Sequence, residues 1–346
     1  MPARKKIDWP ACAARLGAAL PVERLHPAVV DWARQSPSKA AWTIGFSGGA
    51  DSLALLLLVW AHWPERRSKL TALHFNHRLR GAAANRDERF CQEVSRRLGI
   101  RHRSARWEES IRGASEASAR AARHEFFGAE MRRLRATALW LGHQQDDVAE
   151  TMLMRLARGS GSGGLAAPRP VQLMPKGRVH LRPLLNLKKN EITAALVAEK
   201  IPWREDASNV AGNYLRNRLR RDVVPKWIQA NEGRDSLAGA ALARELLEED
   251  DAALNAWLAE IAPIMKDGSL NLRRLAGRPR ALMRRALHEW LAVNLDEAAL
   301  SRQAFTRLLD DLMVARTTRH SVSRGGFAKI EKHRLVFERT PRKLSN

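Results

Sequence analysis

The chain has 346 residues, of which 45% are hydrophobic, so it can form two packed domains, and wholesale disorder is not expected. Its formal net charge of +23 favours a polyanionic partner such as nucleic acid, although arginine-rich solvated faces would give the same total. With only two cysteines, Cys12 and Cys91, the chain has no disulfide framework and no CxxC pair, which indicates a reducing, cytoplasmic compartment.

The first elements along the chain are an N-terminal extension, a buried strand and a buried helix. Residues 1–40 are expected to form the extension with a short helix, because Asp8, Pro10 and Arg15 interrupt an apolar run that otherwise imitates a signal peptide. Residues 41–48, AWTIGFSG, are typical of a buried parallel strand. The run LALLLLVWA in the next helix is too short to span a bilayer, so we expect no membrane partner.

Strands and helices then alternate up to about residue 158. We expect further strands at 70–76, 101–107 and 137–143, and helices at about 84–98, 115–136 and 146–158. This alternation predicts an α/β fold, a Rossmann-like parallel sheet with helices on both faces. Ligands of such sheets bind beyond the carboxyl ends of the strands.

The later part of the chain changes character. The segment GSGSGG (159–164) is either a flexible linker or a substrate loop, and helices are expected at 188–200, 213–227, 236–261, 280–294 and 300–315. We place the catalytic domain at 41–228. Residues 229–346 are then a helical linker and a smaller, mainly helical C-terminal domain that ends in a basic β-hairpin (319–339).

The stretch SGGADS, Ser47 to Ser52, joins the first strand to its helix and is called the glycine loop below. Gly48 and Gly49 allow a sharp turn close to an anion, while amide groups and the two serine hydroxyls can donate to phosphate. Asp51 fits this picture if Mg²⁺ lies between it and the phosphates. A glycine turn followed by an ordinary helix cap is the alternative. The Walker pattern GxxxxGK[ST] is absent from the chain.

Acids and histidines follow the other strands. Asp147 and Glu150 share one face of a first helical turn and suit a metal, a cationic substrate or simple stabilisation of the helix dipole. His74, His77 and His143 end strands at the same edge and are either structural or contacts for a nucleotide. They lack the carboxylate spacing of a zinc site.

Arginines gather on two further helices. Arg120 and Arg123 lie three residues apart on one face and can reach phosphate oxygens, or they form a solvated face. The stretch YLRNRLRR carries an aromatic ring at Tyr214 for stacking on a base, and the amide of Asn217. Its guanidinium groups for phosphate are those of Arg216, Arg218, Arg220 and Arg221. In the terminal hairpin and just before it, the expected phosphate contacts are Arg316, Arg319, Arg324, Lys329, Lys332 and Arg334.

Several ordered motifs together resemble one known family. SGGADS looks like the PP-loop of the N-type ATP pyrophosphatases, and the closer resemblance is to the tRNA(Ile)-lysidine synthetases. The motifs that carry it are HFNHRLRG (74–81), EASARAARHEFF (116–127), GHQQDDVAET (142–151), RGSGSGGL (158–165), RPLL (182–185) and EDASN…YLRNRLR (205–220). The resemblance covers about residues 41–225 and is weak in the tail.

This resemblance implies a cytoplasmic C–N ligase of tRNA modification. ATP would activate C2 of the wobble cytidine in tRNA(Ile) with a CAU anticodon, and the ε-amine of free L-lysine would then displace AMP, which changes decoding from AUG to AUA. It implies Mg²⁺ at Asp51 and catalytic roles for Asp51, Arg120, Asp147 and Glu150, the last two binding lysine. ATP would lie against Ser47, Gly48, Gly49, Ala50, Asp51, Ser52, His74, Arg120, Gly142 and His143. The tRNA would contact Arg158, Ser160, Arg182, Tyr214, Arg216, Asn217 and Arg220. The family also suggests a homodimer.

Three other functions share some of these features. A tRNA 2-thiolation enzyme has the same loop, but usually needs paired cysteines or a cluster. A small-molecule ATP pyrophosphatase of the amidotransferase type needs a glutamine-hydrolysing domain, for which the sequence offers no nucleophilic cysteine. A non-enzymatic RNA-binding module would explain the charge, but not the acids and glycines at the strand ends.

Overall fold

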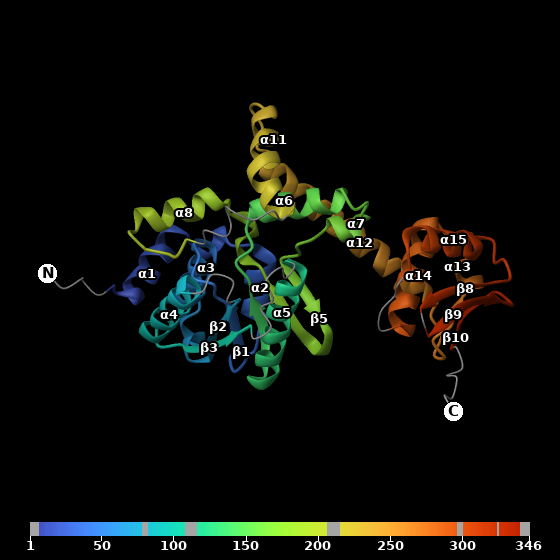
Figure 1. Ribbon diagram of the computed structural model, residues 1–346, viewed down its shortest axis with the longest axis horizontal. Coiled ribbons are helices and arrows are strands. Elements are labelled where there is room, and N and C mark those ends of the chain that lie inside the picture. Colours follow the sequence, from blue (N-terminus) through green and yellow to red (C-terminus); the bar gives the residue numbers. More distant parts are fainter. Residues whose placement is uncertain are drawn as a thin grey trace. The chain divides into compact units, whose positions relative to one another are not determined.

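The computed structural model divides the chain into two compact units, Met1–Glu248 (unit 1) and Glu249–Asn346 (unit 2) (Figure 1). It describes residues 7–77, 82–107, 116–205, 215–295, 300–323 and 325–339. The division falls within a long helix, α12 (Ser236–Ile261), whose first residues Leu237 and Ala240 pack against Ala149 and Val224. A functional boundary at 228/229 stays a prediction.

Unit 1 is built on a six-stranded sheet with the order β3-β2-β1-β4-β6-β5. Neighbouring strands are parallel, except that β5 pairs antiparallel with β6. The strands are β1 (Ala41–Gly45), β2 (Leu70–Asn76), β3 (Arg101–Arg106), β4 (Ala136–Trp140), β5 (Val171–Met174) and β6 (Arg178–Leu181). The parallel sheet is confirmed, whereas the β5–β6 hairpin was not expected. Because the strand order reverses on either side of β1, its carboxyl end is a switch point where ligands bind.

Hydrophobic side chains cover both faces of this sheet. In β4, Ala138 and Trp140 belong to the larger core cluster, while Leu139 packs with Phe127 and Met131 in a second cluster. This alternation follows from the two-residue period of a strand. Helix α5 (Glu116–Arg133) supplies the second cluster. The larger one is supplied by α1 (Trp9–Ala19), α2 (Pro27–Gln35), α3 (Ala50–His62), α4 (Ala82–Arg97) and α8 (Lys189–Ala198).

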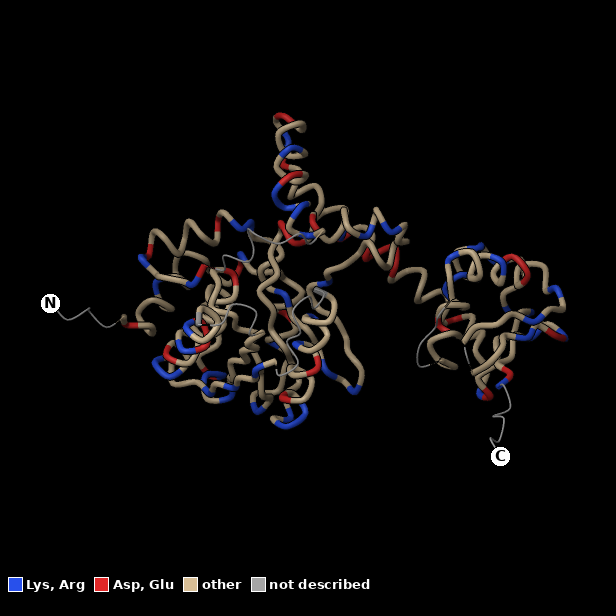
Figure 2. Tube along the Cα trace, in the orientation of Figure 1, with Lys and Arg blue, Asp and Glu red and all other residues tan. Residues whose placement is uncertain are grey.

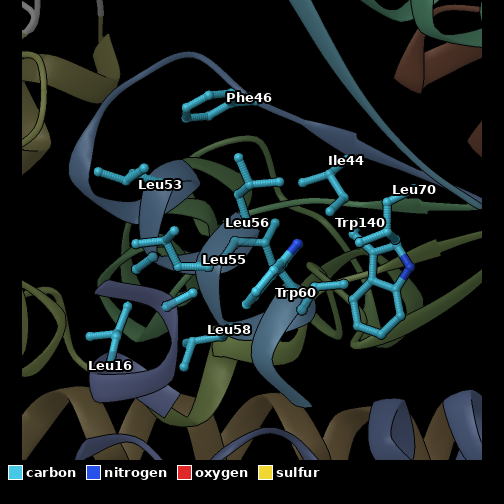
Figure 3. Close-up of a cluster of buried hydrophobic side chains, with 14 of the residues drawn as sticks. Leu16, Ile44, Phe46, Leu53, Leu55, Leu56, Leu58, Trp60, Leu70 and Trp140 are labelled. Carbon is cyan, nitrogen blue, oxygen red and sulfur yellow. The ribbon is translucent and has the colours of Figure 1, made fainter. Parts of the chain in front are cut away.

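Helix α3 lies in the middle of the larger cluster, where Leu53, Leu55 and Leu56 meet the strand residue Ile44 (Figure 3). Leu16 from α1 joins the same cluster, so the segment that we expected to precede the domain is part of its core. A helix that is apolar on every side must be buried, as α3 is from Leu53 to Trp60. Among the described residues, no helix has both the length and the hydropathy needed to cross a membrane.

The remaining helices of unit 1 lie near the carboxyl edge of the sheet. They are α6 (Gln145–Leu156), α7 (Ser162–Leu165), α10 (Leu215–Arg218) and α11 (Val224–Ala230), with the π-helical turn η5 (Leu219–Val223) between the last two. The expected basic helix is therefore interrupted by a wider turn within its described part. Short 3₁₀ turns complete the unit: η1 (Val22–Arg24), η2 (Pro64–Lys69), η3 (Pro175–Gly177) and η4 (Pro183–Asn186).

Unit 2 packs helices against an antiparallel sheet with the order β7-β10-β9-β8. Its core includes Leu287 and Trp290 from α14 (Arg280–Asn294) and Leu308 from α15 (Arg302–Met313). The other elements are β7 (Leu270–Asn271), α13 (Leu272–Leu275), β8 (Thr318–Ser323), β9 (Gly326–Glu331) and β10 (Arg334–Arg339). The expected terminal hairpin is thus part of a larger sheet, in which three consecutive strands pair in turn. Lysine and arginine are spread over both units (Figure 2).

Truncating the centre of α3 tests this account of the core. We expect Leu56→Ala to lower the free energy of unfolding by about 2–5 kcal/mol, because the removed atoms leave a cavity in a fully buried cluster. Urea unfolding followed by circular dichroism measures the change. Leu246→Ala in α12, where the side chain is 52% exposed, is the control and should stay within about 0.5 kcal/mol of the parent. Equal losses in the two variants would contradict the assignment of α3 as the core helix.

Candidate functional site

The glycine loop turns directly from β1 into α3, with Gly49 as the N-cap of the helix. Gly48 has a φ of +92°, a conformation that glycine adopts without steric cost. Ser47 and Ser52 close the turn, since their hydroxyl oxygens lie 3.0 Å apart and the Ser52 hydroxyl donates to the Gly49 carbonyl at 3.0 Å. The serine hydroxyls also accept the main-chain N–H groups of Ser47 at 3.2 Å and Gly49 at 3.4 Å, so the two serines shape the loop. An anion could use the other N–H groups of the loop and of the first turn of α3, or replace these serine contacts.

Gly142 brings the end of β4 against the start of α3. A Cβ atom on Gly142 would lie 3.0 Å from the Asp51 carbonyl oxygen and 3.1 Å from the Asp51 carbonyl carbon. Because both neighbours are backbone atoms, a larger residue would push the two elements apart. This close approach places the residues after β4 beside the glycine loop.

Asp51 is a carboxylic acid with an unsatisfied oxygen. Its Oδ1 atom is buried and has no hydrogen-bond partner among the residues that the structure describes. Burial, reinforced by the negative charge of Asp147, raises the pKa of Asp51 from 3.8 to about 6. A cation placed at this oxygen would relieve both effects, so the site fits Mg²⁺. The described residues contain no group of three or more acids, histidines or cysteines that could hold a metal alone. The chain would therefore share the ion with ligand phosphates.

Asp147 and Glu150 are buried and point into the protein from the first turn of α6. The Asp147 carboxylate accepts a hydrogen bond from the main-chain N–H of Gln144 at 3.0 Å, as part of a capping box. It accepts a second hydrogen bond from the Arg216 guanidinium at 2.5 Å. Glu150 accepts Arg216 Nε at 2.7 Å and Arg220 Nε at 2.6 Å. Helix capping therefore uses one oxygen of Asp147, while the remaining carboxylate oxygens take cations.

These four residues form one network, called the acid–arginine cluster below: Asp147, Glu150, Arg216 and Arg220. The sequence had suggested separate roles, lysine binding for the acids and phosphate binding for the arginines. In the structure the guanidinium groups of Arg216 in α10 and Arg220 in η5 form ion pairs with the two acids of α6. Asn217 lies between them on α10 and is half-buried, and Tyr214 lies outside the described residues.

The three histidines of the strand ends are held by their neighbours. His74 is buried, and its Nδ1 donates to the Phe46 carbonyl at 2.9 Å, so it supports the strand that leads into the glycine loop. His77 packs its ring against Phe75. Burial, together with the charge of Arg182, holds the pKa of His143 well below its usual range, so this ring is neutral.

Arg182 is the partner of His143. Its Nε donates to His143 Nδ1 at 3.2 Å, and its terminal nitrogens donate to the Arg169 carbonyl at 2.7 Å and to Gln172 at 2.9 Å. The guanidinium is buried and anchors the β5–β6 hairpin. Burial and the nearby charge of Arg120 lower the pKa of Arg182 to about 10. This geometry favours an anchoring role over the expected contact with tRNA.

A group of exposed or half-buried arginines lies around Arg182 at the same edge. Arg120 is exposed on α5, and its charge also contributes to the lowered pKa of Arg155, which burial dominates. Arg155 donates to the Gly164 carbonyl, and its own carbonyl accepts the amide of Ser160 at 3.0 Å. The glycine-serine segment is therefore an ordered turn into α7, with Arg158 exposed beside it. Such a concentration of positive charge suits an anionic ligand.

The basic residues expected to bind phosphate in unit 2 form ion pairs in which each cationic side chain is exposed. Arg316 pairs with Asp311, Arg319 with Glu338, Lys329 with Glu331 and Arg334 with Asp267, at 2.8–3.4 Å. Exposed pairs of this kind contribute little stability, so a phosphate could replace their acids. Lys332 is exposed on the turn before β10, and Arg324 lies outside the described residues.

The sequence matches a known family and several named proteins. The family described as PP-loop domain matches residues 24–227. The chain is 37% identical over 279 residues to the tRNA(Ile)-lysidine synthase of Geobacter sulfurreducens, covering 76% of this chain and 56% of that protein. It is 38% identical over 252 residues to the protein of the same name from Pseudomonas aeruginosa, covering 71% and 53%. The chain thus spans about half the length of the curated relatives it matches.

One solved structure shares the fold. The U34-tRNA thiolase NcsA from Methanococcus maripaludis superposes with a TM-score of 0.51 at 17% identity, over 69% of this chain and 78% of that one. This likeness supports the parallel sheet and its helices, and says nothing about the reaction.

The raised pKa of Asp51 predicts that the free energy of unfolding depends on pH. Because its pKa is raised on folding, the unfavourable contribution of the ionised group develops as the pH rises from about 4 to above 6. We therefore expect Asp51→Asn to stabilise the ligand-free protein at pH 7.5 by up to about 3 kcal/mol, and not at pH 4. Urea unfolding at a series of pH values measures the difference. Asp31→Asn, which removes an exposed acid of α2, is the matched control; parallel curves for the two variants would disprove the role of burial.

Proposed function

Because the chain belongs to the PP-loop domain family, we propose that it is a tRNA(Ile)-lysidine synthetase. It uses ATP to activate C2 of the wobble cytidine, C34, in tRNA(Ile) with a CAU anticodon. The ε-amine of free L-lysine then attacks C2, and lysidine, AMP and pyrophosphate are the products. The tRNA and lysine would meet in the cytoplasm, and assembly as a homodimer stays a prediction.

The observation that carries this proposal is the position of the acid–arginine cluster beside the glycine loop. Asp147 is close enough to Asp51 for its charge to raise the pKa of that residue. A loop suited to phosphates and a pair of buried carboxylates that already hold cations therefore share one edge of the sheet. An enzyme that joins a nucleotide-activated base to a cationic amino acid needs these two sites next to each other.

In the first step the cytidine O2 atom attacks the α-phosphorus of ATP, a P–O bond to the new adenylate forms, and pyrophosphate leaves. The chain's contribution is alignment and charge compensation. The amide groups of the glycine loop hold the phosphates, and Arg120 adds a positive charge at the edge of α5. Mg²⁺, held by Asp51 and phosphate oxygens, would neutralise part of the negative charge of the leaving pyrophosphate.

In the second step the lysine nitrogen forms a bond to C2 and the C2–O bond to AMP breaks. The ε-ammonium must first lose a proton, because only the neutral amine is a nucleophile. Asp147 and Glu150 bind the ammonium groups of lysine, and one carboxylate of this pair accepts that proton. In the present structure Arg216 and Arg220 occupy these acids, so bound lysine must share the carboxylate oxygens with them or displace them.

A tRNA thiolase is the alternative from the same superfamily, and the cysteines argue against it. Both Cys12 and Cys91 are buried and free. Burial raises the pKa of Cys91 well above its usual value, while sulfur transfer needs a reactive thiolate or a cluster. No observation on this chain favours the thiolase over the lysidine synthetase.

The proposed reaction can be tested directly. Purified protein is mixed with labelled lysine, ATP, Mg²⁺ and unmodified tRNA(Ile) with a CAU anticodon. We expect label on the tRNA together with one AMP and one pyrophosphate for each lysine. Continued turnover of ATP to AMP and pyrophosphate without lysine, or no lysine label on the tRNA, would reject the proposal. Elongator tRNA(Met), which has the same anticodon, serves as the specificity control.

The acid pair makes a second prediction for the same assay. We expect Asp147→Asn and Glu150→Gln each to raise the KM for lysine by about tenfold or more, because each removes a charge-assisted contact to an ammonium group. The KM for ATP should change much less. Asp146→Asn is the matched control, since Asp146 lies in the same helical turn but accepts the Lys189 amide at 3.0 Å. Unchanged lysine dependence in both acid variants would remove them from the site.

A further inference from the structure

Arg204 contacts the glycine loop from outside the sheet. It follows Ile201, a buried residue of the large core cluster, and Trp203, which packs against the same cluster. The main-chain amide of Arg204 donates to the carbonyl oxygen of Gly48 at 2.9 Å. Gly48 is the residue of the loop with positive φ, so this hydrogen bond holds the peptide whose backbone conformation is the most unusual in the turn.

The side chain of Arg204 is fixed by an acid of α4. Its Nε lies 2.8 Å from Asp87 Oδ1, and the side chain of Asp87 is only 7% exposed. Removal of Arg204 would leave the buried Asp87 carboxylate without its counter-charge, so this acid holds the partly exposed Arg204 side chain in place. The Arg204 stem lies 3.4 Å from the point that a Cβ of Gly48 would occupy, directly against the loop.

Helix α4 also supports the loop one turn further on. Cys91, four residues after Asp87 and therefore on the same helix face, has its sulfur 3.2 Å from the same Cβ position of Gly48. Its thiol donates to the carbonyl of Phe46 at 3.7 Å. Cys91 thus contacts the start of the loop directly, whereas Asp87 acts on it through Arg204.

These contacts set the direction of a loop amide. In a trans peptide the C=O and N–H groups point in opposite directions. With the Gly48 carbonyl bound to Arg204, the amide of the same peptide, Gly49 N–H, must point away from Arg204. It donates to the Ser47 hydroxyl at 3.4 Å, a long hydrogen bond that a phosphate oxygen on the same side could replace. Rotation of this peptide would turn a donor into an acceptor and repel a phosphate oxygen.

We propose that Asp87 and Arg204 are positioning residues that hold the Gly48–Gly49 peptide with its N–H toward the nucleotide phosphates before ATP binds. Neither residue touches the reacting atoms. The pair acts through the hydrogen bond from the Arg204 main chain to the Gly48 carbonyl. Because the loop is already ordered, ATP binding does not have to supply the free energy of ordering it. The proposal rests on the proposed function only in taking ATP as the ligand of the loop.

The test measures ATP binding without tRNA or lysine, so that its result is independent of the proposed reaction. Binding of ATP with Mg²⁺ is measured by calorimetry for the full chain, for Asp87→Asn and for Arg204→Lys. We expect about tenfold weaker binding in each variant, the size of one charge-assisted contact. Arg24→Met breaks the Arg24–Glu191 pair elsewhere in unit 1 and should bind ATP like the parent.

A second readout separates positioning from a loss of stability. The side chain of Arg204 is 37% exposed, so Arg204→Lys should remain folded even if Asp87→Asn does not. In lysine incorporation, a positioning role raises the KM for ATP and leaves the KM for lysine near the parent value. Equal ATP affinity in Arg204→Lys and Arg24→Met, or a parallel rise of both KM values, would overturn the proposal. Weak ATP binding in the parent itself would instead count against the proposed function.

Discussion

The close approach of Gly142 to the backbone of Asp51 governs the whole carboxyl edge of the sheet. It brings the residues after β4 against the first turn of α3, so acids from two different helices share one small region. Burial is the main cause of the raised pKa of Asp51, and repulsion from the neighbouring charge of Asp147 adds to it. Arg216 and Arg220 compensate for part of this concentration of negative charge.

The acids differ in how that compensation is made. Asp147 and Glu150 are saturated by Arg216 and Arg220, whereas Asp51 Oδ1 has no hydrogen-bond partner among the described residues. This unsatisfied oxygen beside the glycine loop suits a metal ion that arrives with a nucleotide. A carboxylate pair already bound to guanidinium groups suits exchange with another organic cation. One edge of the sheet can therefore hold an anionic and a cationic substrate together.

The arginines of this protein differ in burial and in their partners. Arg182 is buried and fixes the β5–β6 hairpin, while Arg120 and Arg158 are exposed at the edge. The exposed pairs of unit 2 are held by acids that a polyanion could replace. Counting charges along the chain cannot separate these classes, because burial and partners decide whether an arginine anchors the fold or remains available to a ligand.

Local chemistry in the sequence was sufficient for the alternating strands and helices, the glycine loop and the acids of α6, because each depends on residues close together in the chain. The tertiary structure decided what local patterns do not contain. It placed α1 in the core, added the β5–β6 hairpin, and joined Arg216 and Arg220 to acids some 70 residues earlier. It also showed that Asp87 and Arg204 meet at the glycine loop, although 117 positions separate them. Such contacts arise from the packing of distant segments, since a guanidinium pairs with whichever carboxylate the fold buries beside it.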